Sequence, residues 1–210
     1  MPCVAAAAAR QFQPGILAFG EKHLSDKKIE FWIRVGHSKV FQTLLHILDL
    51  IEKWLLLVKF LLLVSLIGWV GAITTKTEIP LWYANLHKPA WNPPNEVFGP
   101  VWTLLYIIIA IVGWRLWRKV PGRSKLEKFK SRAVQFYFIQ LFLNAAWSPI
   151  FFGMHRIELA LIDIYMMIIF VVLTMRAAKP VDIVSFWLLA PYLAWIAYAS
   201  TLNAAIVWLN

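Results

Sequence analysis

The sequence contains few of the residues that build cross-links, metal centres or catalytic groups. Cys3 is the single cysteine among 210 residues, which excludes a disulfide framework within one chain and a metal site made of thiolates. The five histidines show no paired spacing, so the sequence predicts no metal site. No acid–base pair or nucleophile arrangement stands out either. The sequence therefore favours a function other than that of an enzyme.

Charged residues are also scarce. They make up 15% of the chain, whereas hydrophobic residues make up 60%, which is too apolar for an ordinary soluble domain. Because backbone groups in lipid must be paired within their own segment, apolar runs of about 20 residues are predicted to be membrane-spanning helices. We predict an all-α integral membrane protein with a bundle of five transmembrane helices, at residues 54–73, 97–117, 133–152, 159–175 and 184–208.

The basic residues are unevenly distributed. The net charge of +10 suggests nucleic acid as a partner, but eight of the 21 basic residues lie within 115–132 and seven precede the first span. The loop after the first span contains only two basic residues, Lys76 and Lys88. This alternation follows the positive-inside rule, so we expect no nucleic acid and a cytoplasmic N-terminus and 115–132 loop. A scaffold role, in which this loop binds anionic lipid or a partner, stays open.

The first 53 residues differ from the rest. Residues 1–20 are rich in alanine and contain one arginine and no acid, which resembles an organellar transit peptide. Ser38 is a predicted helix cap, and residues 39–53 alternate at helical spacing between an apolar and a polar face. We predict an amphipathic helix in the membrane interface, or a surface helix folded onto the protein's own loops. The predicted domains are an N-terminal extension, 1–53, and a membrane domain, 54–210. Residues 1–50 are a targeting segment, a lineage-specific extension or the result of a wrongly chosen start codon.

Polar residues inside the spans predict an inward-facing surface. Gln140, Asn144 and Ser148 recur every fourth residue of the third span and form one line along a helix face. Because lipid gives amides no partner, this face is predicted to point inward, either as a set of interhelical hydrogen bonds or as a cavity wall. Asp163 in the fourth span is either a functional residue or a capping or bridging acceptor.

Aromatic residues gather on matching faces of two other spans. Trp195, Ala199 and Leu202 fall within about 60° of one another on the fifth span, and the small alanine leaves a recess between its bulky neighbours. Trp102 and Tyr106 form a similar stripe on the second span. Twelve tryptophans exceed what two interfacial belts need. The sequence therefore predicts aromatic surfaces inside the bundle.

One stretch is rich in both prolines and aromatic residues. The run WYANLHKPAWNPPNEVFGPVWTLLY, residues 82–106, resembles the signature of the TspO/translocator protein family, formerly called the peripheral-type benzodiazepine receptor. The resemblance continues through LNAAWSPIFFG at 143–153, ALID at 160–163, PYLAW at 191–195 and the pair Leu202-Asn203. It covers about residues 55–210 and falls in every span except the first.

The resemblance implies a fold and a function. Members of the family are five-helix bundles, often dimeric, with a pocket beneath the first loop, here 74–96, which folds over it as a lid. They bind tetrapyrroles such as protoporphyrin IX and haem, and in animals cholesterol. We therefore expect a membrane receptor or carrier for porphyrin transport, scavenging or stress regulation, with porphyrin as a ligand and no obligatory cofactor. The expected location is a bacterial membrane or an organellar one (mitochondrial outer, plastid or secretory).

The resemblance also implies site residues by position. Trp102 and Trp195 match tryptophans linked in some bacterial members to light-dependent porphyrin breakdown, so photo-oxidative degradation is an alternative function. Sterol or other lipid binding is another, although the tail 202–210 lacks the tyrosine and basic residue of the animal sterol pattern. Lys88, His87 and Arg156 are expected near the ligand's propionates. The implied ligand-binding residues are Phe98, Gly99, Val101, Trp102, Asn144, Trp147, Asp163, Trp195, Ala199 and Leu202, and those of the lid are Trp82, Lys88, Pro89, Trp91, Pro93 and Pro94.

Overall fold

A computed structural model describes residues 38–122 and 124–210. The transit-like segment 1–20 lies outside the described residues. The chain divides into two compact units between Leu56 and Leu57, and the second contains all the residues that line the cavity described below. The described residues form helices and connections without any strand, and five of the helices are long and apolar enough to cross a membrane. The prediction of an all-α membrane protein with five spans is confirmed.

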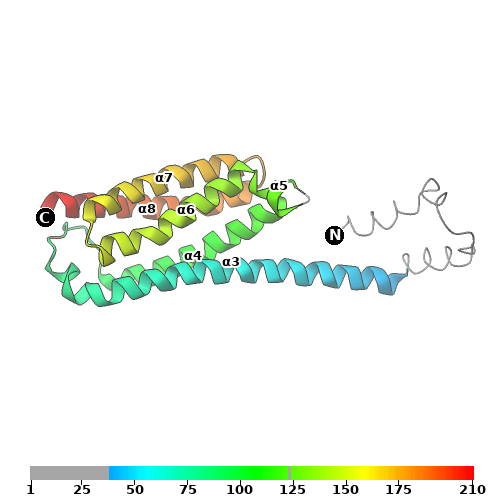
Figure 1. Cartoon of the computed structure of the whole chain (residues 1–210), viewed down its shortest axis with the longest axis horizontal. Helices are drawn as coiled ribbons and strands as arrows, with labels where there is room; N and C mark the ends of the chain where they lie inside the picture. Colours follow the sequence, from blue (N-terminus) through cyan, green and yellow to red (C-terminus); the bar gives the residue numbers. More distant parts are fainter. Residues whose placement is uncertain (1–37, 123) are drawn as a thin grey trace, which may run out of the picture. The chain divides into compact units, whose positions relative to one another are not determined.

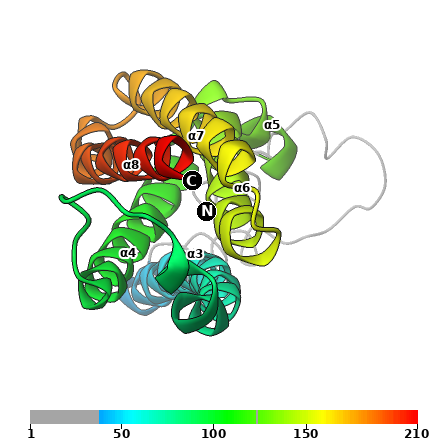
Figure 2. The same ribbon diagram turned by 90° about the vertical axis from the view of Figure 1, so that its left-hand side faces the viewer.

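The five long helices surround a common interior. In the end-on view of Figure 2, the order around the bundle is α3, α4, α8, α7 and α6. Figure 1 shows that the short helix α5 lies at the opposite end of the bundle from the connection between α3 and α4. The long helices are α3 (Lys39–Leu81), α4 (Asn95–Lys119), α6 (Arg132–Ser148), α7 (Ile157–Ala178) and α8 (Ile183–Leu209); the short ones are η1 (Tyr83–Asn85), α5 (Lys125–Phe129) and η2 (Pro149–Gly153).

Helix α3 is longer than predicted at both ends of its span. Its N-terminus is capped as expected, because the Ser38 hydroxyl accepts a hydrogen bond from the Phe41 N–H at 3.2 Å. The segment 39–53 then runs into the first span without a break, and its position in the membrane interface stays a prediction. The polar residues after Ile73 do not end the helix, because the Thr74 and Thr75 hydroxyls donate to the Gly71 carbonyl within it. The predicted loop 74–96 is therefore wrong in its first part, and the connection comprises residues 82–94.

The third span changes its helical form near its end. Pro149 has no N–H to donate and its ring crowds the preceding turn, and here the chain widens into the π-helix η2. The Met154 N–H bonds to the Pro149 carbonyl at 2.9 Å, which closes this wider turn. Within it the adjacent residues Phe151 and Phe152 are both buried. The π-turn thus directs two consecutive aromatic side chains into the bundle.

An ion-pair cluster joins α4 to the start of α8 at the end far from the 82–94 connection. The Asp182 carboxylate accepts hydrogen bonds from Arg115 Nε at 2.7 Å and Nη2 at 3.0 Å, from Lys119 Nζ at 2.7 Å and from the Ser185 hydroxyl at 2.7 Å. The Arg115 guanidinium, aided by Lys119 and Ser185, holds the pKa of Asp182 well below its usual range. The charge pattern alone assigned Arg115 and Lys119 to membrane topology, and their pairing with Asp182 is a second role that spacing did not reveal.

Candidate ligand-binding cavity

A cavity of about 850 Å³ lies among the five long helices, within the size range of small-molecule binding pockets. All five helices contribute to its wall, and Tyr83 from η1 borders it at the end near the 82–94 connection. Eight of the ten predicted ligand-binding residues line it: Phe98, Gly99, Trp102, Asn144, Trp147, Trp195, Ala199 and Leu202. Neither Val101 nor Asp163 is among its lining residues.

Flat aromatic side chains form much of the wall. Phe98 of α4 meets Trp195 of α8 edge-to-face, with ring centroids 5.9 Å apart. Trp102 and Tyr106, one helical turn apart on α4, have centroids 5.3 Å apart. On the α6 side, Trp147 stacks on Phe151 at 4.9 Å. The cavity thus presents ring faces from three helices to whatever occupies it.

The amides of the third span join the helices together. Asn144 accepts a hydrogen bond from the Tyr106 hydroxyl at 3.2 Å and donates to the Tyr192 hydroxyl at 3.0 Å. The Tyr192 hydroxyl in turn donates to Gln140 Oε1 at 3.1 Å. This chain links α4, α6 and α8, so the interpretation as interhelical hydrogen bonds holds for Gln140 and Asn144. Asn144 lines the cavity as well, so the two alternatives stated for this face are compatible.

Asp163 is one of the two implied ligand-binding residues that do not line the cavity. Its residue is buried in α7, with 7% of its surface exposed, and its Oδ2 atom has no hydrogen-bond partner within the described chain. It does not border the cavity. In the described ranges no group of three or more His, Cys, Asp or Glu residues is arranged to hold a metal ion.

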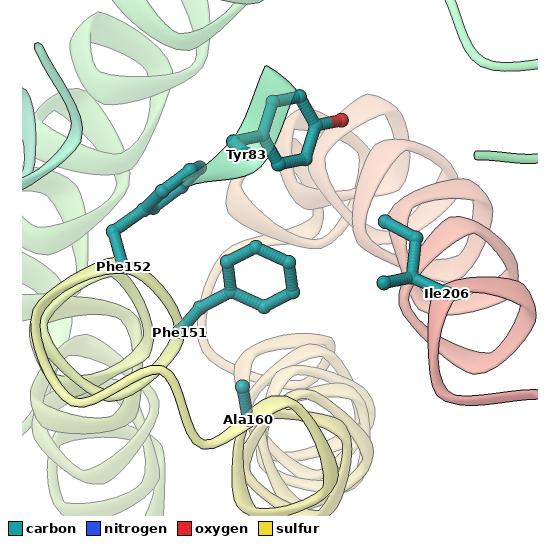
Figure 3. Close-up of a cluster of buried hydrophobic side chains, with 5 residues drawn as sticks. All are labelled: Tyr83, Phe151, Phe152, Ala160 and Ile206. Carbon is teal, nitrogen blue, oxygen red and sulfur yellow. The ribbon is translucent and has the colours of Figure 1, made fainter. Parts of the chain in front are cut away.

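A cluster of buried side chains closes the cavity at the end near the 82–94 connection. Figure 3 shows Tyr83, Phe151, Phe152, Ala160 and Ile206 pointing toward one another from η1, η2, α7 and α8. Four of them (Tyr83, Phe151, Phe152 and Ile206) also line the cavity. The connection is therefore joined to the bundle by hydrophobic packing directly above the cavity.

Most of the predicted lid residues support the connection itself rather than the cavity wall. Lys88 Nζ donates to the carbonyls of Tyr83, Ala84 and Leu86 at 2.7, 3.3 and 2.9 Å, so its ammonium group holds η1 together. The ring of Trp82 packs edge-to-face on Phe151 at 5.5 Å. None of the six predicted lid residues lines the cavity. They make contacts within the connection or are exposed to solvent. These residues are Trp82, Lys88, Pro89, Trp91, Pro93 and Pro94.

Hydrogen bonds fasten the connection to α8. The His87 N–H donates to Asn210 Oδ1, and Asn210 Nδ2 donates back to the His87 carbonyl, both at 3.0 Å. The Tyr198 hydroxyl donates to the Trp91 carbonyl at 2.8 Å. In Figure 2 the connection accordingly passes from α3 toward α8 before it turns back to α4. The helix that supplies Trp195 and Ala199 to the cavity wall thus also holds the connection above it.

Helix α3 supplies cavity residues that sequence reasoning missed. A Cβ atom added at Gly68 would lie 2.8 Å from Cε2 of Tyr106, so glycine lets the α4 ring approach α3. Gly71, Ala72 and Lys76 follow on the same wall. Gly68 and Ala72 are small residues four apart, a spacing from which the sequence predicts close helix contact but not a cavity wall. Lys76 had no such signal, because its position past the predicted span end placed it in a loop.

Five spans around an aromatic-lined cavity define a multi-pass membrane protein. Residues 60–209 match the model of the TspO/MBR family. The chain is 41% identical to the tryptophan-rich protein TspO of Archaeoglobus fulgidus over 154 residues, which cover 73% of this chain and 96% of that protein. It is 41% identical to the tryptophan-rich protein TspO of Chlorobaculum tepidum over 144 residues, 69% and 89% of the two chains. With the Homo sapiens translocator protein the identity is 38% over 158 residues, 74% and 89%. The chain belongs to the TspO/MBR family.

Proposed function

We propose that the protein is a membrane receptor or carrier that binds tetrapyrroles, such as protoporphyrin IX or haem, inside the helix bundle for porphyrin transport, scavenging or stress regulation. The observation that supports this proposal is the cavity of about 850 Å³ with ring faces on three of its walls. A flat macrocycle stacks favourably on such faces and buries its apolar surface against them. The family also includes a protein named tryptophan-rich sensory protein, from Cereibacter sphaeroides, 37% identical to this chain.

A fluorescence titration tests the proposal. Five tryptophan or tyrosine rings (Tyr83, Trp102, Tyr106, Trp147 and Trp195) line the cavity, so protoporphyrin IX bound there will quench the intrinsic emission saturably. A blocked variant, Ala199→Phe, places a ring in the recess beside Trp195 and is expected to reduce the affinity for protoporphyrin IX more than tenfold. If the purified protein shows no saturable quenching in either detergent or lipid, the proposed function is wrong.

A second function uses the same cavity. Trp102 and Trp195, the two tryptophans implied in porphyrin breakdown, both line it, so a photo-excited porphyrin would lie against oxidisable indole rings in the presence of dioxygen. Illumination of the complex while the Soret absorption is followed distinguishes degradation from binding. A protein that only binds will leave the decay equal to that of free porphyrin, whereas a degrading protein will accelerate it, and Trp102→Phe will slow it again.

A further inference from the structure

We propose that Lys76 is the anion-binding residue of the cavity and that the ligand therefore presents a carboxylate at the end near the 82–94 connection. This inference rests on the proposed function and deepens it, because it selects an acidic amphiphile over a neutral one. Among the residues of 38–122 and 124–210 that line the cavity, Lys76 is the single one with a formal charge. Helix α3 brings it there by continuing past Ile73 to Leu81.

The ammonium group of Lys76 is available to a ligand. No hydrogen bond or ion pair in the described part of the chain involves its side chain, and the residue is exposed at the cavity border. The nearest acid along the helix, Glu78, is engaged elsewhere, because its Oε2 lies 2.9 Å from His155 Nε2. A carboxylate entering the cavity would thus meet a cation that has no protein counter-ion of its own.

The other basic residues at this end are occupied or lie outside the cavity. Lys88, the residue first expected to meet ligand propionates, gives its donors to three backbone carbonyls. The His155 ring stacks on Trp82 with centroids 4.2 Å apart and contacts Glu78. Neither His87 nor Arg156 lines the cavity. The expected contact between propionates and a basic residue is therefore reassigned to Lys76.

The cavity is polarised along its length. Lys76 on α3 and Asn95 at the start of α4 border it at the end near the connection, whereas the residues that border it farther along the bundle, such as Leu61, Asn144 and Met167, carry no formal charge. An amphiphile with a flat apolar body and an acidic edge fits this gradient in one orientation, with the acid beside Lys76. A neutral ligand gains nothing from that charge, so Lys76 separates acidic from neutral ligands.

The test compares protoporphyrin IX, which has two carboxylates, with its uncharged dimethyl ester. Tryptophan quenching is titrated with each probe for the wild type, Lys76→Gln, Lys76→Arg and the control Lys125→Gln, which removes an exposed lysine of α5 at the opposite end. We expect Lys76→Gln to weaken the diacid about tenfold, equivalent to about 1.4 kcal/mol, and to leave the ester unchanged. Lys76→Arg and Lys125→Gln keep the wild-type affinity for both probes. Added salt weakens the diacid in the wild type more than in Lys76→Gln, because exposed charges are screened.

The outcomes separate this inference from the function on which it rests. If Lys76→Gln leaves the affinity for the diacid unchanged, or weakens acid and ester equally, the role of Lys76 is refuted while porphyrin binding stands. If the wild type binds neither probe saturably, the proposed function itself fails. Because Lys76 is exposed, the variants are expected to fold, and equal apparent melting temperatures check this.

Discussion

The paired hydrogen bonds between Asn210 and His87 predict how firmly the 82–94 connection is held. Asn210→Ala removes both bonds to His87, each of which contributes about 0.5–1.5 kcal/mol net. Since both are solvent-exposed, we take the lower half of that range and expect a total loss of about 1–2 kcal/mol. A change of that size corresponds to roughly a 5- to 30-fold increase in the open population of the connection.

Hydrogen exchange measures this increase directly. The His87 N–H is itself a donor in the pair, so its exchange should accelerate by the same roughly 5- to 30-fold factor in Asn210→Ala. Asn85→Ala is the matched control, because the Asn85 side chain donates to the Leu81 carbonyl within its own segment rather than to α8. If His87 exchanges at the wild-type rate in Asn210→Ala, or accelerates as much in Asn85→Ala, the fastening described above is not what holds the connection.

Three further predictions concern the cavity and the two clusters that hold the helices. Ala199→Phe fills the recess on the cavity wall and should reduce porphyrin affinity more than tenfold, as measured by fluorescence titration. Tyr192→Phe removes the hydroxyl that links Asn144 to Gln140 and should cost about 1–3 kcal/mol in thermal unfolding, because it leaves buried amide groups unpaired. Asp182→Asn weakens the ion-pair cluster and should cost about 2–3 kcal/mol, below the roughly 3–5 kcal/mol of a fully buried pair, because Arg115 and Lys119 are partly exposed.

The Ala199→Phe prediction has a matched control, and the Asp182→Asn prediction has a pH dependence. Ala194→Phe places the same ring on an exposed position of α8 and should leave porphyrin affinity unchanged; an equal loss would show that bulk on α8, rather than the cavity, is responsible. Because the pKa of Asp182 is depressed in the folded protein, its stabilisation is fully present above the ordinary pKa of about 3.9 and is lost as the pH falls toward the folded value. Asp182→Asn should therefore reduce the fall in melting temperature that the wild type shows at acid pH. A fall as large as that of the wild type would contradict the assignment of this stabilisation to Asp182.

The sequence predicted the spans well and the connections less well, for a physical reason. Hydropathy reports where lipid surrounds a helix, so it located all five spans but ended the first one at Ile73, where polar residues begin. Helical hydrogen bonds do not depend on lipid, and the Thr74 and Thr75 hydroxyls are satisfied within the helix. The π-turn at Pro149 likewise depends on local backbone geometry that periodicity does not reveal.

The residues of the candidate site were likewise predicted only in part from the sequence. Periodic motifs on single helices, such as Trp195 and Ala199, identified cavity walls, because residues on one face share one environment. Contacts between segments distant in sequence, such as Arg115 with Asp182, depend on how helices are placed side by side, and no spacing within one segment encodes them. Family resemblance implied Asp163 as a ligand contact, but the structure places it beside the cavity rather than on its wall.

Because of the Asp182 cluster, α4 and α8 are held by different kinds of contact at their two ends. Several short, directional bonds from Arg115, Lys119 and Ser185 fix the separation and rotation of the helices at one end. At the other end, Phe98 of α4 and Trp195 of α8 meet through ring contacts, and the Tyr198 hydroxyl of α8 donates to the Trp91 carbonyl shortly before α4 begins. Separating α4 from α8 at the basic end would therefore break charged hydrogen bonds, whereas separating them at the cavity end would break ring contacts and the hydrogen bond from Tyr198 to the Trp91 carbonyl.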